Sequence, residues 1–314
     1  MSELAVRLTC VSKSFGAHAA VSDLDLEIPR GSITGLLGPN GSGKTTTIRM
    51  MMAILLPDRG QVELLGGFPD FDRRSRVGYL PEERGVYEKR KVLDQLAFLG
   101  EIRGIDRRVA RSRAMRWLER LGLSDWADKK VQTLSKGMQQ KVQFVGTVLH
   151  EPELLILDEP FSGLDPINQE VLEAIVLEER RRGATILFST HLMEQAERIC
   201  ERVCLIASSR KVLDGDLREI KRRERSGVVA VEFEGDDRWL SSLDVAGIEE
   251  VGHAHHLTLG PRTDSARVLA AAAAAGVGVR RFEVLEPTLR EIFVSHAGVP
   301  ADEEPVLLAA GGAR

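Results

Sequence analysis

Cysteine is scarce in this sequence. The 314 residues include three cysteines, Cys10, Cys200 and Cys204. An odd and widely spaced set does not form a disulfide framework. We therefore expect all three thiols to be small buried hydrophobic side chains in a protein of a reducing compartment.

The sequence also lacks an excess of charge of either sign. It has 43 lysines and arginines against 47 aspartates and glutamates, which gives a formal net charge of −4. This near balance argues against binding of the whole chain to nucleic acid or anionic lipid through a net positive charge. A local basic patch remains compatible with the composition.

Long apolar runs are missing as well. The longest aliphatic stretch, residues 268–275, is mostly alanine and ends at Gly276, whereas a bilayer span needs roughly 20 apolar residues. The start, Met1-Ser2-Glu3-Leu4, has no cationic segment followed by an apolar run, so we expect no signal peptide. These absences predict a cytoplasmic protein that reaches a membrane only through a partner.

Short apolar runs alternate with helical patterns through most of the first two thirds of the chain. Residues 32–37, 154–157, 185–188 and 203–206 are typical of fully buried parallel strands. Helical patterns lie between them, including one over residues 44–55 that follows the first strand. Strands that alternate with helices predict an α/β fold with a mostly parallel sheet.

The length predicts about two domains. We expect a first domain over residues 1–220, with an inserted helical subdomain at about residues 88–150, where the pattern becomes consecutively helical. The charged residues 221–227 indicate a solvated linker, with a basic contact patch as the alternative. A small α+β appendage is expected over residues 228–296, and a disordered tail rich in Pro, Gly, Ala and acid over residues 297–314.

Within the appendage, alternation and helical spacing predict five elements. They are strands over residues 228–233, 251–259 and 279–284, and helices over residues 264–275 and 288–295.

A glycine-rich loop follows the first apolar strand. It fits the pattern G-x-x-x-x-G-K-[ST] with Gly38, Pro39, Asn40, Gly41, Ser42, Gly43, Lys44 and Thr45. Such glycines let the backbone wrap around phosphate oxygens, and the following helix adds the partial positive charge of its N-terminus. In this pattern Lys44 reaches the β- and γ-phosphates, Thr45 gives its hydroxyl to Mg²⁺, and Thr46 can bond the α-phosphate. The alternative is a glycine-rich turn with a surface lysine.

Two acids follow the apolar run of residues 154–157. Asp158 and Glu159 stand at the carboxyl end of a predicted parallel strand, which is where ligands bind in α/β sheets. Beside a phosphate loop, Asp158 is expected to contact Mg²⁺ through water and Glu159 to polarise an attacking water. Acids at a strand end can also simply cap the next helix.

Five further segments occur in order around these motifs. They are Phe15, Gly78-Tyr79-Leu80-Pro81-Glu82, Leu134-Ser135-Lys136-Gly137-Met138-Gln139-Gln140, Ser162-Gly163-Leu164-Asp165, and His191 after an apolar strand. With the phosphate loop and the acidic pair, this order resembles the nucleotide-binding subunit of an ABC transporter over about residues 4–220. The resemblance implies a phosphate-loop NTPase core that uses ATP and Mg²⁺.

The resemblance also implies individual roles. Phe15 stacks on adenine, Glu82 stands where the Q-loop has glutamine and can ligate Mg²⁺, and Asp165 belongs to the D-loop. His191 holds the γ-phosphate and the attacking water in line, so that Lys44, Glu159 and His191 form the catalytic set. A lone histidine is otherwise more often a structural residue.

The signature segment is implied to act across a dimer. Ser135 and Gly137 begin a helix whose free N–H groups face the γ-phosphate held by another subunit. Ser135 is also a good helix N-cap in its own right. Lys136 and Met138 depart from the usual signature residues, but neither change removes a catalytic group. Residues 80–87 and 285–293 are most similar to bacterial sodium-efflux-type ATP-binding proteins with a small C-terminal domain.

The function implied by this resemblance is ATP hydrolysis that powers a separate membrane permease, with export as the expected direction. We expect a homodimer or heterodimer of ATPase subunits, bound at the inner face of the membrane through the permease, with no nucleic-acid partner. The alternative is a soluble ABC ATPase that moves nucleic acid or protein machinery. Such proteins usually carry two cassettes or long coiled coils, whereas this sequence has one cassette and no heptads.

Overall fold

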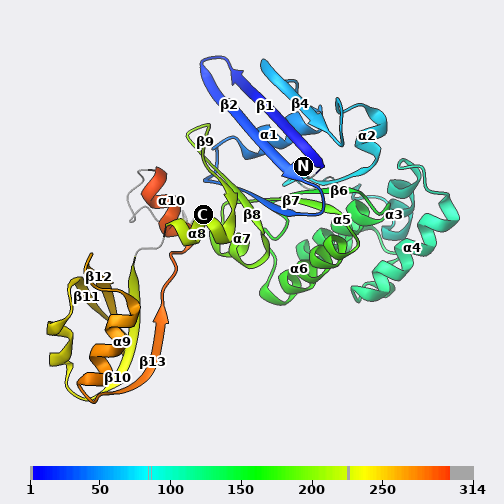
Figure 1. The fold of residues 1–314 in the computed structure, drawn as a ribbon. Coiled ribbons are helices and arrows are strands. Elements are labelled where there is room, and N and C mark those ends of the chain that lie inside the picture. The colour runs from blue at the N-terminus through cyan, green and yellow to red at the C-terminus, as the bar shows by residue number, and fades with distance from the viewer. Residues whose placement is uncertain (1–2, 84, 86, 225–226, 298–314) are drawn as a thin grey trace, which may run out of the picture. The chain divides into compact units, whose positions relative to one another are not determined.

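The chain divides into two units, one ending at Leu217 and one starting at Arg218 (Figure 1). The computed structural model describes residues 3–83, 85, 87–224 and 227–297. The disordered tail expected over residues 297–314 therefore lies outside the described residues from residue 298 onward.

The segment expected to be a linker begins as a helix. Helix α8 covers Leu217–Arg223, so the predicted linker over residues 221–227 is helical at its start. Lys221, Arg222 and Arg223 occupy the last turn of α8. Cations at that position interact favourably with the partial negative charge of a helix C-terminus, which explains why a charged run is helical here.

A six-stranded sheet forms the centre of the first unit. Its strands lie in the order β5 (Val77–Leu80), β6 (Leu154–Asp158), β7 (Thr185–Thr190), β3 (Ile33–Leu37), β8 (Arg202–Ala207) and β9 (Arg210–Asp216). The first five strands are parallel, and β9 pairs antiparallel with β8. Every residue of β3, β6 and β7 is buried, as continuous apolar strands predict. The expected α/β core is confirmed.

The sequence does not predict the second sheet of this unit. It consists of β1 (Leu4–Phe15), β2 (His18–Pro29) and β4 (Arg59–Leu64), antiparallel in the order β2-β1-β4. A register shift between Leu8 and Val11 interrupts the alternation that would reveal β1. Cys10 lies in this interruption with φ of +49° and is exposed, so its predicted burial is wrong. Cys200 and Cys204 are buried, as expected.

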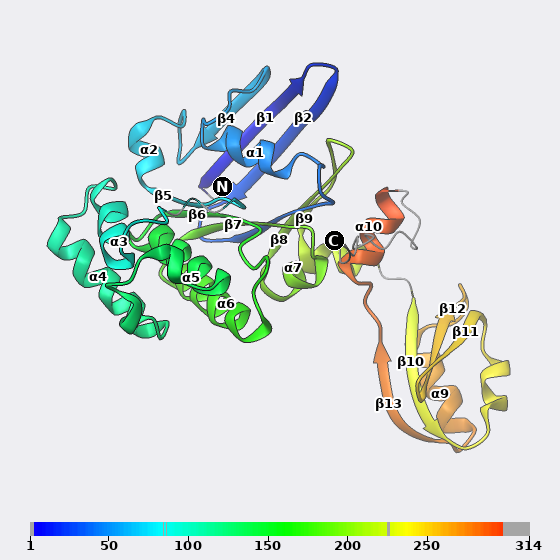
Figure 2. The ribbon, with the colours of Figure 1, turned by 180° about the vertical axis from the view of Figure 1, so that it is seen from behind.

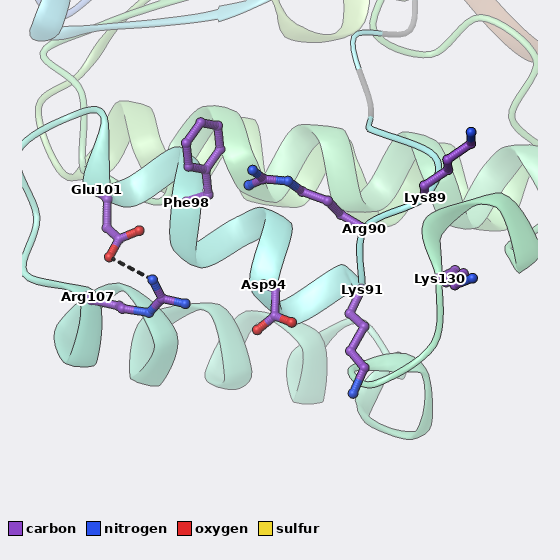
Figure 3. Close-up of a pocket in the computed structure, with 8 residues that line it drawn as sticks. All are labelled: Lys89, Arg90, Lys91, Asp94, Phe98, Glu101, Arg107 and Lys130. Carbon is purple, nitrogen blue, oxygen red and sulfur yellow. Dashed lines mark hydrogen bonds and ion pairs between the residues drawn. The ribbon is translucent and has the colours of Figure 1, made fainter.

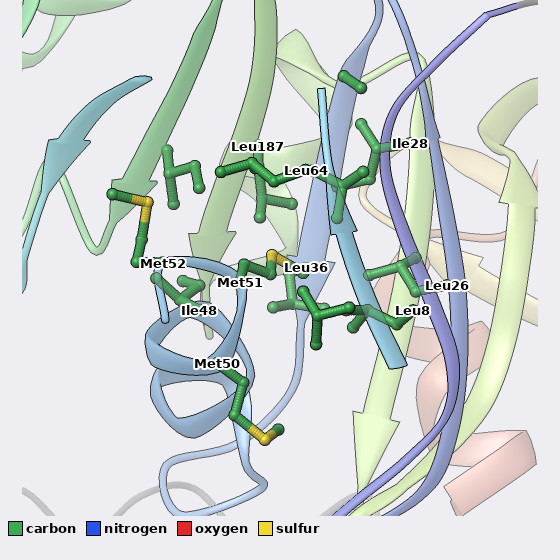
Figure 4. Packing of buried hydrophobic residues seen from close by; sticks show 14 of the residues in the cluster. Leu8, Leu26, Ile28, Leu36, Ile48, Met50, Met51, Met52, Leu64 and Leu187 are labelled. Carbon is green, nitrogen blue, oxygen red and sulfur yellow. The ribbon is translucent and has the colours of Figure 1, made fainter. Parts of the chain in front are cut away.

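Helix α1 (Lys44–Met51) packs with both sheets into one core (Figure 4). Its Ile48 and Met51 belong to a buried cluster with Leu8 of β1 and Leu36 of β3. The helix ends at Met51 and not at residue 55, because Ala53 adopts a left-handed conformation with φ of +49°. This packing holds α1, and the loop before it, against the parallel sheet.

The segment between β5 and β6 is helical, as expected. Its main helices are α3 (Val92–Glu101), α4 (Arg107–Arg120) and α5 (Lys136–Val148), with short 3₁₀ turns at Ser124–Trp126 and Val131–Thr133. A Cβ on Gly100 would lie 2.7 Å from the Cβ of Ala110, so two small residues allow α3 and α4 to approach closely.

Three more helices complete the first unit. They are α2 (Phe71–Ser75), α6 (Pro166–Arg181) and α7 (Met193–Ile199). Within the residues that the structure describes, no helix is both long and apolar enough to cross a membrane.

The second unit contains a four-stranded antiparallel sheet (Figure 2). Its elements are β10 (Val228–Glu234), a 3₁₀ helix at Asp237–Ser242, β11 (Val245–Val251), β12 (Ala254–Leu259), α9 (Ser265–Ala274), β13 (Gly278–Val284) and α10 (Leu289–Ala297). The strand order β11-β12-β10-β13 is that of a split β-α-β unit. The strand predicted over residues 251–259 corresponds to β12, which begins only at Ala254 because a turn at Gly252 separates it from β11. The sequence does not predict β11, because nearly all of that strand is exposed.

Candidate active site

The glycine-rich loop connects β3 to α1 at the carboxyl end of the parallel sheet. Gly38 has φ of +153°, and a Cβ there would lie 2.1 Å from the carbonyl oxygen of Ile206. Gly43 has φ of +109°, and its Cβ would lie 2.3 Å from the carbonyl oxygen of Ala20. Both positions therefore require glycine, for conformation and for space.

Lys44 lies folded back into this loop. Its side chain is buried, and Nζ donates to the carbonyl oxygens of Gly38 at 2.7 Å and of Pro39 at 3.1 Å. Burial lowers the pKa of Lys44, whereas the charges of Glu159, Asp158 and Glu82 act in the opposite direction. The interpretation of Lys44 as a surface lysine on a glycine-rich turn is therefore wrong, because its side chain is buried and bonded within the loop.

Asp158 ends β6 and is 1% exposed. Among the described residues, no donor lies in hydrogen-bonding position for either of its carboxylate oxygens. Burial raises the pKa of Asp158; the hydroxyls of Ser189 and Thr45 oppose this effect, and the charges of Glu82 and Glu159 add to it. Buried carboxylate oxygens left free in this way are suited to a cation or to water.

Glu159 follows in a strained conformation, with φ of +48°. Its Oε1 accepts a hydrogen bond from the backbone N–H of His191 at 3.0 Å and lies 2.8 Å from His191 Nδ1. Its Oε2 accepts from Thr190 Oγ1 at 3.2 Å. The register of β6 and β7 explains these contacts. Asp158 pairs with Ser189, so Glu159 and Thr190, the residues that follow them, lie side by side.

Neither acid caps a helix. The next helix, α6, is capped by Asp165, whose side chain accepts from Asn168 N at 3.0 Å. This hydrogen bond lowers the pKa of Asp165. The alternative that Asp158 and Glu159 serve as caps is therefore wrong.

Glu82 and Phe15 stand nearer the surface. Glu82 is exposed just after β5, and its charge acts on Lys44 and Asp158. Phe15 ends β1, is 52% exposed, and has the Lys13 ammonium 5.8 Å from its ring centre. Within the described residues, no three His, Cys, Asp or Glu side chains are grouped to hold a metal by themselves. A cation here would depend on one or two carboxylates, a hydroxyl, water and phosphate.

The signature residues make local contacts. Ser135 caps α5 by accepting from Met138 N at 3.3 Å. A Cβ on Gly137 would lie 3.6 Å from Leu164 Cδ2, an ordinary contact, so α5 starts beside the D-loop. No hydrogen bond among the described residues joins Ser135 to the phosphate loop of its own chain.

Two polar residues to which the sequence assigns no individual role touch this site. Thr190 contacts Glu159 directly, and Gln140 Nε2 donates to the carbonyl oxygen of Pro160 at 2.9 Å. Both are buried. A buried threonine immediately before His191 is a signal that could have been read from the strand pattern, whereas the partner of Gln140 could not.

A separate pocket of about 550 Å³ lies on the helical segment (Figure 3). Its lining is rich in cations: Lys89, Arg90, Lys91, Asp94, Phe98, Glu101, Arg107 and Lys130. The Arg90 guanidinium lies 4.2 Å from the ring centre of Phe98 and 5.4 Å from that of Tyr87. Buried Gln95 accepts from Tyr87 N at 3.0 Å, which ties the segment after Glu82 to α3.

A phosphate loop between a parallel strand and a helix, with a buried acidic pair at the same carboxyl edge of the sheet, defines a phosphate-loop nucleoside triphosphatase. The comparisons with known proteins define the family. Residues 21–162 match the family model described as ABC transporter, and residues 215–297 match the C-terminal domain described as ATP-binding protein DrrA1-3-like.

Relatives and solved structures agree. The chain is 43% identical to the ABC transporter ATP-binding protein YhaQ of Bacillus subtilis, over 92% of this chain and 97% of that protein. It is 37% identical to the Nod factor export ATP-binding protein I of Bradyrhizobium diazoefficiens, over 68% and 71% of the two chains. A solved ATP-binding subunit of an ABC transporter is 31% identical with a TM-score of 0.66, covering 70% of this chain and 93% of that one.

The chain therefore belongs to the ATP-binding proteins of ABC transporters, and it is the ATPase subunit of such a transporter. The small C-terminal domain expected for its subgroup is confirmed by the DrrA1-3-like match.

Proposed function

We propose that Lys44, Glu159 and His191 carry out ATP hydrolysis in this subunit and that the reaction drives export through a separate permease. One observation carries the catalytic part: the Glu159 carboxylate is hydrogen-bonded to His191 and acts electrostatically on Lys44 of the phosphate loop. A base, an orienting group and a phosphate-binding cation thus share one edge of the sheet.

The free polar atoms of the site fit ATP and Mg²⁺. Ser42 Oγ and both carboxylate oxygens of Asp158 are buried without a hydrogen-bond partner among the described residues. The loop of residues 38–45, through every backbone N–H except at Pro39, would hold the phosphates together with Thr46, and Phe15 would stack on adenine. Thr45, Glu82 and Asp158 would hold Mg²⁺. The ion would supply positive charge that offsets the negative charge of the transferring phosphoryl group.

The chain's own residues then have distinct tasks. Lys44 stabilises charge on the β- and γ-phosphate oxygens, which requires its ammonium to exchange the carbonyls of Gly38 and Pro39 for phosphate. Glu159 accepts a proton from the attacking water. His191, whose side chain is 39% exposed, can turn between Glu159 and the γ-phosphate. Phosphoryl transfer needs such positioning and charge stabilisation more than covalent chemistry.

The signature helix supports a dimeric site. Ser135 and Lys136 at the start of α5 are exposed, so the free N–H groups of this helix N-terminus are accessible to an anion from outside the chain. We infer a sandwich of two ATPase subunits, identical or different, in which Ser135 and Gly137 of one subunit face the phosphates of the other. Asp165, in the D-loop beside them, belongs to the same interface.

A permease partner fits the surface beside Glu82. Tyr87 is hydrogen-bonded to Gln95 of α3, and the cation-rich pocket of Figure 3 is lined by Arg90, whose guanidinium lies 5.4 Å from the ring centre of Tyr87. A permease that docks here would hold the subunit at the cytoplasmic face of the membrane and receive motion from the site. Export is supported by the Nod factor export relative.

Glu159→Gln tests the catalytic assignment. The variant keeps size and polarity but loses the base, so we expect ATP binding to persist and turnover to fall by at least ~10²-fold. Turnover is measured as phosphate release from the purified full chain, and binding by calorimetry. Glu178→Gln, which changes an exposed glutamate on α6, is the matched control and should leave both unchanged. Near-normal phosphate release from Glu159→Gln would contradict the assignment.

A further inference from the structure

Thr190 is the second partner of the Glu159 carboxylate. It ends β7 and is fully buried, and its Oγ1 donates to Glu159 Oε2 at 3.2 Å. The backbone N–H of Leu192 donates to the same hydroxyl oxygen at 3.1 Å, which directs the hydroxyl proton away from Leu192. The other acceptor within reach is Gln195 Oε1 at 3.5 Å. The charged and nearer acceptor, Glu159, is favoured.

The two oxygens of Glu159 are therefore held by unequal partners. Oε1 accepts from the backbone N–H of His191 and lies beside the His191 ring, which is partly exposed and can rotate. Oε2 is held by Thr190, which has no exposed surface and lies on a strand paired on both sides, with β6 and with β3. The central sheet fixes the backbone of Thr190 and burial encloses its side chain, so the hydroxyl stays within reach of Glu159 when the His191 ring turns.

We propose that Thr190 is a positioning residue for Glu159: its hydroxyl keeps the carboxylate fixed beside the phosphate loop when the His191 ring turns to another acceptor. This rests on the proposed role of Glu159 as the base. The backbone of Glu159 is in a strained left-handed conformation, which persists only where the surrounding contacts hold it in place.

A purely structural role is the competing account, because the same hydroxyl closes the turn to Leu192. The two roles differ in what they change. Loss of a turn contact lowers stability and spares chemistry, whereas loss of the constraint on Glu159 lowers the catalytic rate and spares ATP binding. Thr190→Val removes the hydroxyl and keeps the shape, and Thr190→Ser keeps the hydroxyl. Thr190→Ala removes the hydroxyl without adding a methyl group, in case the valine variant does not fold.

The experiment measures kcat and KM for ATP of the full chain for each variant, alone and combined with Glu159→Gln, together with thermal unfolding midpoints. We expect Thr190→Val to lower kcat by about tenfold, the effect typical of one hydrogen bond to a charged group, with KM for ATP unchanged. Thr190→Ser should restore kcat. In the Glu159→Gln background, Thr190→Val should have no further effect on the residual rate, because a positioning residue acts only through its partner.

Wild-type kcat in Thr190→Val or Thr190→Ala would overturn the proposal. So would a Thr190→Ser variant as slow as Thr190→Val, or an equal loss from Thr190→Val with and without Glu159→Gln. A Glu159→Gln variant with near-normal turnover is a different outcome, because it refutes the proposed base itself while leaving the Thr190 measurements to be read separately.

Discussion

Replacing Ser135 by arginine separates a role in the partner's site from a role as a helix cap. Ser135 is exposed at the start of α5 and caps it through Met138 N. Ser135→Arg puts a bulky cation where a second subunit's γ-phosphate would approach the helix N-terminus. The phosphate loop of the same chain is untouched, so ATP affinity of the monomer should change little.

The two roles of Ser135 predict different effects on stability and on activity. Loss of the cap alone costs about 0.5–2 kcal/mol of stability, which lowers the unfolding midpoint by a few degrees. Asp106→Ala is the matched control, because Asp106 caps α4 in the same helical segment through the N–H groups of Arg108 and Val109. Both variants should lose similar stability. Only Ser135→Arg should lose ATPase activity and ATP-driven dimerisation in a Glu159→Gln background, measured by light scattering.

Mixing two inactive variants gives the sharpest assay. In a dimer of one Ser135→Arg chain and one Lys44→Ala chain, each ATP site combines the phosphate loop of one chain with residue 135 of the other. One of the two sites then carries both substitutions, and the other carries neither. Random pairing of equal amounts therefore leaves about a quarter of the sites intact in a symmetric sandwich. We expect phosphate release from the mixture near that fraction of the wild-type rate, although each variant alone is inactive. A mixture no more active than its parts, or persistent Ser135→Arg dimers, would refute the action of Ser135 across the dimer.

Two further predictions concern the phosphates and the metal. Lys44→Ala should weaken ATP binding itself, because the ammonium contacts phosphate before the reaction; unchanged affinity by calorimetry would contradict the phosphate-loop assignment. Glu82→Gln should keep ATPase activity but alter its Mg²⁺ dependence, because either side chain offers an oxygen while the glutamine lacks the charge that acts on Asp158. Identical Mg²⁺ titrations of the two proteins would show that Glu82 is not a ligand.

The parts of the site that the sequence determined are those built from neighbouring residues. The phosphate loop needs glycines at Gly38 and Gly43 and a lysine at Lys44, and all three stand within one turn between a strand and a helix. The sequence also predicts the buried strands β3, β6 and β7, because a strand that is covered on both faces is apolar throughout. Local spacing and composition carry such features without any knowledge of the rest of the fold.

Tertiary structure alone decided which groups meet. The contact of Glu159 with both His191 and Thr190 follows from the register between β6 and β7, whose residues are about thirty positions apart in the chain. The sequence does not predict the antiparallel sheet, because the register shift in β1 breaks the alternation of buried and exposed residues. It does not predict β11, because nearly all of that strand is exposed. Register and burial depend on the partner strand, so a pattern within one segment cannot determine them.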